Sequence, residues 1–208
     1  MSAFREVRAS FTAETITVYQ AYPAEIAEPA LRAGNFVPPF KRERMTWIKP
    51  SFLWMAYRCG WATKLKQERV LAVEITRQGF EWALAHSCLS HHTQNAKENS
   101  CSWEEHKRAS PVRVQWDPER DLLLHPLPYR SIQIGLSGTA VDRYLDEWIV
   151  SIRDVTFLMK EISDLMSTGQ REAARAALPL EHLYPLPDDI AQVVEASSAR
   201  AAEESAKK

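Results

Sequence analysis

The first half of the chain alternates between short apolar runs and amphipathic segments, which predicts strands and helices in turn. Residues 16–22 are rich in β-branched and aromatic side chains, and this composition favours a strand. Residues 24–33 predict a short helix that Gly34 is placed to end. Residues 50–59 predict a second helix, because proline suits a first helical position and a glycine follows the segment.

The most apolar run, VLAVEI at residues 70–75, predicts a central strand. Its nearly continuous apolar character is typical of a strand that is covered on both faces. Thr76 can accept a hydrogen bond at the start of a helix that runs to about His86. We therefore expect this strand to lead directly into a helix.

The middle of the chain shows the two-residue period of half-buried strands. Residues 112–116 alternate between apolar and polar side chains. Residues 117–120 predict a turn, and residues 122–124 predict a returning strand. Residues 131–136 alternate again, with isoleucine and leucine on one face. Hairpins of this kind predict a largely antiparallel sheet.

The last third of the chain has a helical period. Residues 141–152 repeat apolar side chains at the spacing of one amphipathic helix, and residues 158–166 and 170–177 predict two more. The expected fold class is therefore α+β, a mostly antiparallel sheet with helices and a C-terminal helical segment. We expect one domain over residues 1–187 and a helical or disordered tail over residues 188–208.

Composition narrows the class of protein. The 208 residues include 26 Lys and Arg against 27 Asp and Glu, so the net charge is -1 and gives no overall case for nucleic-acid binding. Seven Trp, seven Phe and six Tyr exclude wholesale disorder. No run of about 18 apolar residues is present, so we expect no membrane span. Three cysteines and a polar first segment favour an intracellular, cytoplasmic location.

The most unusual segment is residues 41–69, which holds eight basic residues against two acidic ones, with three tryptophans between them. Guanidinium groups bind phosphate through paired hydrogen bonds, and aromatic rings stack on bases, so this mixture suits a nucleotide or nucleic-acid site. The alternative is that the tryptophans lie in the core and the cations face water. The candidate cofactor-binding residues in this segment are Arg44, Trp47 and Arg58, and Lys49 and Ser51 are candidate catalytic residues.

Further candidates lie in or beside the predicted strands. Tyr19 and Gln20 come near the end of the first strand, and Arg130 and Gln133 flank the start of the last. Glu74 lies within the apolar strand and is a candidate acid–base group if its face meets a ligand. Each residue also has a structural explanation, such as core packing or membership of a solvent-facing polar row.

Cysteine and histidine residues gather in a polar stretch without a strong secondary-structure signal. Their spacing matches no standard zinc site, so we expect unliganded loop residues and no metal. The residues concerned are Cys88, His91, His92, Cys101 and His106. No P-loop, GxGxxG, HExxH or GxSxG pattern is present.

Several long motifs stand out along the chain: TITVYQAY, NFVPPF, RMTWIKPSFLWMAYRCGWA, QERVLAVEI, ASPVRVQWDPERDL, YRSIQIGLSG and the DEWIVSI–DVT run. Together they resemble the family called domain of unknown function 4291 (DUF4291) over roughly residues 5–187. This resemblance brings no established activity.

A second pattern is similar to the opening of ADP-ribosyltransferase-like folds. It runs from the VYQAY strand through the helix that ends LRAGNFVP to a helix start with serine and then VLAVEI. The resemblance implies a split β-sheet that cradles NAD, with one site residue from each of three motifs. The nearest positions are Tyr19 or Gln20, Lys49 or Ser51, and Gln133, which all differ from the family's usual residue types.

Three functions remain as hypotheses. The first is a transferase-like protein that binds NAD or a related nucleotide and has nucleic acid or protein as the acceptor. The second is a non-enzymatic module for RNA or a phosphorylated ligand. The third is a partner-binding domain that uses the helical stripe around Trp148. The first two share one geometric expectation, that residues 44–58 border a pocket together with residues 131–134.

Overall fold

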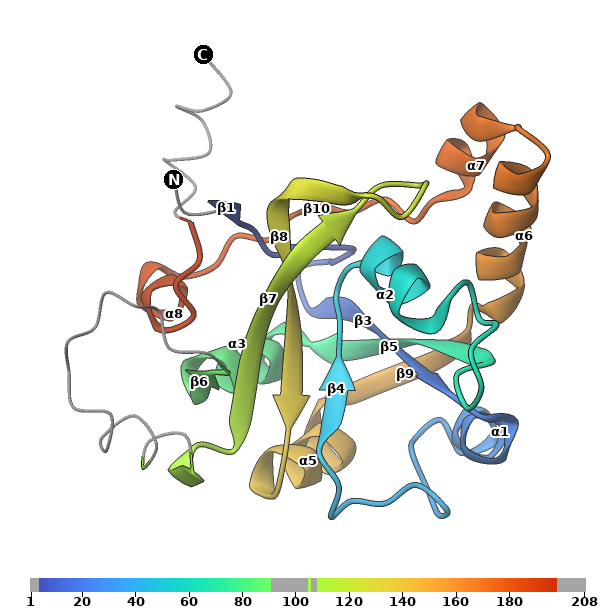
Figure 1. Cartoon of the computed structure of the whole chain (residues 1–208). Coiled ribbons are helices and arrows are strands. Elements are labelled where there is room, and N and C mark those ends of the chain that lie inside the picture. Colours follow the sequence, from blue (N-terminus) through green and yellow to red (C-terminus); the bar gives the residue numbers. More distant parts are fainter. Residues whose placement is uncertain (1–3, 91–104, 106–107, 198–208) are drawn as a thin grey trace.

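Two β-sheets form the centre of the protein (Figure 1). This computed structural model describes residues 4–90, 105 and 108–197. The larger sheet has five strands and the smaller has three, and helices pack around both. Antiparallel pairing dominates, so the predicted α+β class with a mostly antiparallel, split sheet is confirmed.

The five-stranded sheet is built on a long hairpin of β7 (Val112–Arg120) and β8 (Pro126–Leu136). Strand β4 (Thr46–Ile48) pairs antiparallel with the second half of β8. Two short strands add parallel pairs at the edges, β1 (Phe4–Arg5) on β8 and β6 (Ser87–Leu89) on β7. Strand β8 of this hairpin therefore contacts the basic segment 41–69 through its pairing with β4.

The three-stranded sheet has β5 (Arg69–Thr76) in the middle, between β3 (Thr15–Tyr22) and β9 (Ile149–Asp154). All pairs in this sheet are antiparallel. The two sheets meet where Tyr19 N donates to Lys49 O at 2.7 Å. The end of β4 is thus tied to both sheets.

Apolar side chains cover both faces of β5, as the sequence predicts. Val73 and Ile75 face the main core, which lies between the two sheets. Val70 and Ala72 face a second cluster with Phe52. Burying one large apolar side chain contributes about 1.5–3 kcal/mol, so a strand buried on two faces is a main source of stability.

Local signals place the first three helices within two residues, although Pro50 lies before the cap of the second helix and not at its first helical position. Helix α1 (Ala24–Ala33) ends at Gly34, whose φ of 67° suits glycine. Helix α2 (Phe52–Cys59) starts at Ser51, whose side chain accepts a hydrogen bond from Trp54 N. Helix α3 (Arg77–Ala85) starts at Thr76, which accepts from Gly79 N. Short-range capping chemistry is sufficient to define these ends.

The predicted single helix over residues 141–152 is wrong. The chain instead forms α5 (Thr139–Arg143), one π-helical turn η1 (Tyr144–Trp148) and then strand β9. Three of the four residues that start β9, Ile-Val-Ser-Ile, are β-branched, and β5 offers them an open edge, so sheet pairing overrides the helical period. Trp148 is 3% exposed and packs over Gly79, where a Cβ would lie 2.3 Å from the indole. The stripe therefore meets the chain's own core and not a partner.

The predicted turn at residues 117–120 is also wrong. Strand β7 continues to Arg120, and the reversal falls at residues 121–125, where Leu124 has a φ of 62°. The ladder between β7 and β8 is irregular between Pro118 and Arg120. A proline is tolerated in a strand at such an irregularity, so Pro118 does not end the strand.

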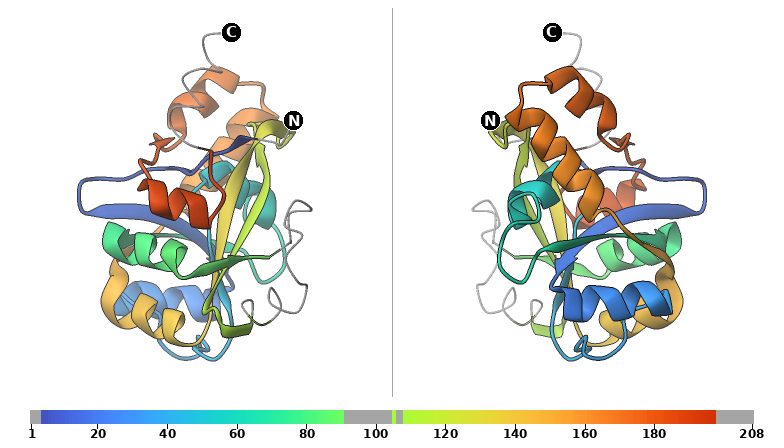
Figure 2. Two further views of the ribbon diagram at one scale, coloured as in Figure 1. Left: turned by 90° about the vertical axis from the view of Figure 1, so that its left-hand side faces the viewer. Right: turned by 90° about the vertical axis from the view of Figure 1, so that its right-hand side faces the viewer.

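The chain after β9 is helical, as predicted (Figure 2). Helices α6 (Thr156–Ser167) and α7 (Arg171–Ala177) precede the two-residue strand β10 (His182–Leu183), which pairs with β2 (Arg8–Ala9). Helix α8 (Asp188–Val193) then packs on the main core through Ile190. The start of the predicted tail is thus part of the folded body.

Within the described ranges, no helix is long and apolar enough to cross a membrane. The candidate zinc residues His91, His92, Cys101 and His106 fall outside those ranges, and Cys88 is buried at β6.

Candidate functional site

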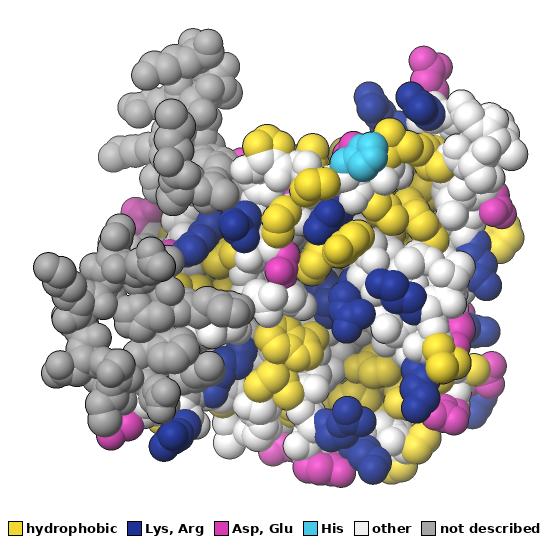
Figure 3. All heavy atoms as spheres, viewed as in Figure 1, with side chains coloured by type: hydrophobic (Ala, Val, Ile, Leu, Met, Phe, Trp, Pro, Cys, Tyr) yellow, Lys and Arg dark blue, Asp and Glu magenta, His cyan; other side chains and the backbone are white. Residues whose placement is uncertain are grey.

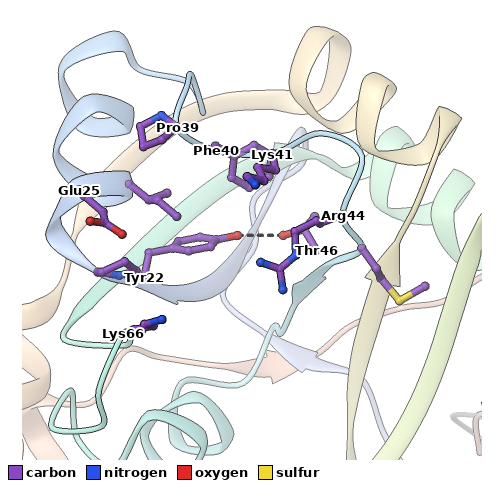
Figure 4. Close-up of a pocket in the computed structure, with 11 residues that line it drawn as sticks. Tyr22, Glu25, Pro39, Phe40, Lys41, Arg44, Thr46 and Lys66 are labelled. Carbon is purple, nitrogen blue, oxygen red and sulfur yellow. Dashed lines mark hydrogen bonds between the residues drawn. The ribbon is translucent and has the colours of Figure 1, made fainter.

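A cavity of about 570 Å³ lies where α1, the segment before β4 and the loop after α2 meet (Figure 4). This volume is within the range of small-molecule sites. The lining residues are Tyr22, Pro23, Glu25, Ile26, Pro39, Phe40, Lys41, Arg44, Met45, Thr46 and Lys66. Most of the lining is therefore apolar or aromatic, with a few charged groups.

Three cations converge on this cavity from different parts of the chain. Lys41 and Arg44 come from the segment before β4, and Lys66 comes from the loop after α2. Glu25 on α1 is the acidic residue of the lining. Figure 4 shows Lys41, Arg44 and Lys66 around the Tyr22 side chain. The local charge therefore favours an anionic ligand.

A buried hydrogen-bond network forms the floor of the cavity. The Tyr22 hydroxyl lies 2.9 Å from Thr46 Oγ1, and Gln20 Nε2 donates to Thr46 Oγ1 at 2.7 Å. Tyr144 on η1 donates to Gln20 Oε1 at 2.7 Å. Burial raises the pKa of Tyr22 to about 12, so its hydroxyl stays neutral at physiological pH. The predicted site residue Gln20 thus lies behind the cavity and supports its floor.

Aromatic packing and one ion pair hold the wall of the cavity. Phe40 packs against Tyr22 with ring centroids 6.0 Å apart, and against Phe36 at 4.9 Å. Arg42 makes two hydrogen bonds to Asp146 on η1, at 2.8 and 2.6 Å. Arg42 is therefore engaged in anchoring this segment, which leaves Arg44 as the guanidinium group that faces the cavity.

A second polar region lies on the other side of β4. Lys49, the residue after β4, lies near Asp117 on β7, whose charge opposes the lowering of the Lys49 pKa. Gln133 Nε2 donates to Asp117 Oδ2 at 2.7 Å, and Gln115 Nε2 donates to Asp117 Oδ1 at 3.0 Å. A row of polar side chains therefore crosses this face of the sheet.

Lys49 is buried in this region, with 6% of its surface exposed. Its Nζ donates to Trp47 O at 3.2 Å. Desolvation, with a smaller effect from the Arg58 charge, lowers the pKa of Lys49 to about 7. Near neutral pH a large fraction of this amine is therefore uncharged.

Two carboxyl groups lie at the start of α2, close to the predicted site residue Ser51. Glu181 Oε1 accepts from Phe52 N at 2.7 Å, and Glu119 interacts with the hydroxyls of Ser51 and Ser131. Desolvation raises the pKa of Glu119, and raises that of Glu181 to about 8. The sequence carries no local signal for this pair, because Glu181 is 129 residues from Phe52.

The remaining predicted site residues are dispersed. Tyr19 is in the second apolar cluster, edge-on to Phe52, and Trp47 lies over Gly135. Glu74 accepts hydrogen bonds from Ser151 and Arg153 in the other sheet. Arg130 donates to Trp116 O, and Arg58 is exposed on α2.

Residues 44–58 and 131–134 were expected to border one pocket, and the structure separates them into two regions. Segment 46–48 does lie beside β8, but the lining of the 570 Å³ cavity includes no residue from 131–134. Thr46 points to the cavity network, whereas Lys49 lies in the polar region. Strand β4 thus separates the cavity from the region of Lys49, Ser51 and Gln133.

Fold and site together define an α+β protein with a split sheet and a basic, aromatic-lined cavity. The chain belongs to the family described as Domain of unknown function (DUF4291), whose model matches residues 6–184. This match confirms the DUF4291 resemblance. No curated protein and no solved structure matches the chain.

Proposed function

We propose that this protein binds NAD or a related nucleotide in the cavity beside Tyr22 and Arg44. The observation that carries the proposal is the convergence of Lys41, Arg44 and Lys66 on a cavity walled by Tyr22 and Phe40. Nucleotides combine a flat ring with phosphate charge, and both parts have a complement here.

Each part of a nucleotide has a chemically suitable neighbour in the lining. Arg44 can donate two hydrogen bonds to a phosphate, and Lys41 and Lys66 add positive charge. Glu25 can accept a hydrogen bond from a ribose hydroxyl or an exocyclic amine. The rigid floor of Tyr22 and Thr46 reduces the ordering needed on binding.

Replacement of Arg44 by alanine should weaken nucleotide binding by about 10- to 100-fold, since a hydrogen bond to a charged group contributes about 1.5–3 kcal/mol. Isothermal titration with NAD, ADP-ribose and AMP measures this change. If the wild-type protein binds none of these three nucleotides, the proposal is wrong.

The matched control for Arg44→Ala is Arg32→Ala, which removes an exposed guanidinium from the last turn of α1. This variant should bind nucleotides like the wild type. Equal losses in the two variants would attribute the effect to net charge and count against a specific contact at Arg44.

A second candidate function is ADP-ribosyl transfer, and the grouping of Lys49 and Gln133 around Asp117 favours it. In this reaction the bond between nicotinamide and ribose breaks, and its electron pair leaves with nicotinamide. The ribose cation is then captured by water or by an acceptor, which loses a proton. Polar groups such as Gln133 and Asp117 would orient the ribose and stabilise the developing charge.

Release of nicotinamide from NAD, followed by chromatography, tests this second candidate. Gln133→Ala should lower the rate at least about tenfold, because a transition-state hydrogen bond is removed. Glu161→Ala, on the exposed side of α6, should leave the rate unchanged. Absence of nicotinamide release by the wild type would exclude NAD cleavage and leave nucleotide binding as the function.

A further inference from the structure

The outward side of helix α2 presents one cation and one aromatic ring to solvent. Phe52, Met55 and Cys59 point inward and are buried in the second apolar cluster. Tyr57 and Arg58 are exposed on the opposite side. This helix therefore has one side in the core and one side that is basic and aromatic.

The loop after α2 extends this basic surface toward the cavity. Lys64 Nζ donates to Arg58 O at 2.8 Å and lies 5.8 Å from the centroid of the Tyr57 ring. Two residues further on, Lys66 lines the nucleotide cavity. The cations thus follow one another from α2 to the cavity, and we call Arg58, Lys64 and Lys66 the α2 track.

Arg120, at the end of β7, is partly exposed and also contacts Tyr57. Its guanidinium carbon lies 3.7 Å from the centroid of the Tyr57 ring. Trp54 stacks on Tyr57 with centroids 5.1 Å apart. These contacts hold the aromatic ring in one orientation among the cations.

The cations of the α2 track form no side-chain ion pair in the described part of the chain, and the nearby Glu68 carboxylate accepts instead from Lys66 N at 2.9 Å. Within the described part of the chain, no Asp or Glu lies within 4.0 Å of the charged nitrogens of Arg58, Lys64 or Lys66, whereas Arg42 and Arg69 are ion-paired. In Figure 3, Lys and Arg side chains gather over α2 and the area beside β4. Although the chain has a net charge of -1, this area therefore carries positive charge without paired carboxylates.

We propose that the α2 track binds the phosphate backbone of a single-stranded nucleic acid whose terminal nucleotide occupies the cavity. The placement of the terminal nucleotide in the cavity rests on the proposed nucleotide binding. A row of unpaired cations that leads into a cavity for one nucleotide suits a strand end, because successive phosphates can follow the row.

Fluorescence anisotropy with a labelled, 5′-phosphorylated eight-nucleotide RNA tests this proposal. The double variant Arg58→Ala/Lys64→Gln should bind the RNA at least about tenfold more weakly at low salt. The plot of the logarithm of the RNA binding constant against the logarithm of the salt concentration should also become less steep for this variant. Its slope should fall by about 1.4, which is about 0.7 for each of the two lost phosphate contacts. Binding of AMP by the same variant should be unchanged, since the cavity is intact.

The matched control is Lys160→Ala/Arg175→Ala, which removes two exposed cations from α6 and α7. This control should bind the RNA like the wild type. Arg44→Ala should weaken binding of both AMP and the RNA, which supports a shared terminal site.

Three results would overturn the proposal. One is wild-type binding of AMP without binding of the RNA, which leaves the cavity proposal intact. Another is an RNA affinity that the Arg58/Lys64 double variant does not change. The third is displacement of the RNA by vesicles of phosphatidylserine and phosphatidylcholine at matched charge, which would assign the track to a membrane surface. Failure to bind AMP would instead overturn the cavity proposal.

Discussion

Replacement of Lys49 by methionine should make the protein more stable near pH 7. Lys49 is buried, and desolvation lowers its pKa from 10.5 to about 7. Each pKa unit corresponds to about 1.4 kcal/mol, so relief of this penalty is worth up to about 5 kcal/mol. Methionine has a similar length and no charge, and it fits a buried site.

The effect of Lys49→Met should depend on pH in a defined direction. The folded state binds its proton at this amine less tightly than the unfolded state does, so wild-type stability rises as the pH increases from 7 to about 10.5. The gain from the variant is therefore largest at pH 7 or below and disappears near pH 10.5.

Urea denaturation at pH 6, 8 and 10, followed by tryptophan fluorescence, measures this dependence. Lys41→Met, an exposed replacement in the neighbouring segment, should change stability by less than about 0.5 kcal/mol. A Lys49→Met protein that is less stable than the wild type at pH 6 would show that the charged amine is stabilised in the fold.

Replacement of Glu181 by glutamine should stabilise the protein at alkaline pH and have little effect in acid. The pKa of Glu181 is raised to about 8 by burial, so the neutral carboxyl is the form that the fold accommodates. Glutamine is neutral at every pH, and its side-chain oxygen can still accept from Phe52 N.

The direction follows from the raised pKa. The contribution of a neutral Glu181 is complete below about pH 4.5 and is lost as the pH rises through about 8. The advantage of Glu181→Gln should therefore grow over this interval to about 2–3 kcal/mol, less than the full shift implies because part of the side chain remains exposed.

Unfolding of Glu181→Gln and the wild type at pH 5 and pH 8.5 measures that difference. Glu161→Gln, an exposed change on α6, should give the same small difference at both pH values. If Glu181→Gln destabilises the protein equally at pH 5 and pH 8.5, the carboxyl group is ionised throughout and the assignment of a neutral Glu181 is incorrect.

Features with a local physical cause could be predicted from the sequence. Thr76 and Gly34 mark helix ends because capping and left-handed backbone depend on one or two residues. The apolar run of β5 predicts burial on both faces, since no other arrangement covers it. Strand β9 was not predictable in this way, because its partner β5 lies about 75 residues away and the same residues also fit a helical period.

The candidate site, too, could be predicted from the sequence only in part. The basic segment 41–69 contains Lys41, Arg44 and Lys66, so its composition does predict cations for an anionic ligand. Composition cannot show that these cations meet Tyr22, or that α2 folds back and buries Lys49, because both depend on tertiary contacts. Glu181 had no signal at all, since its partner Phe52 N belongs to a distant helix.

A crystal structure of the protein grown with AMP would decide whether the cavity is the nucleotide site. We expect the phosphate within hydrogen-bond distance of Arg44 and Lys66, and the adenine ring against Tyr22 or Phe40. A nucleotide seated at Lys49 and Gln133 instead, or an unliganded cavity at millimolar AMP, would contradict this assignment.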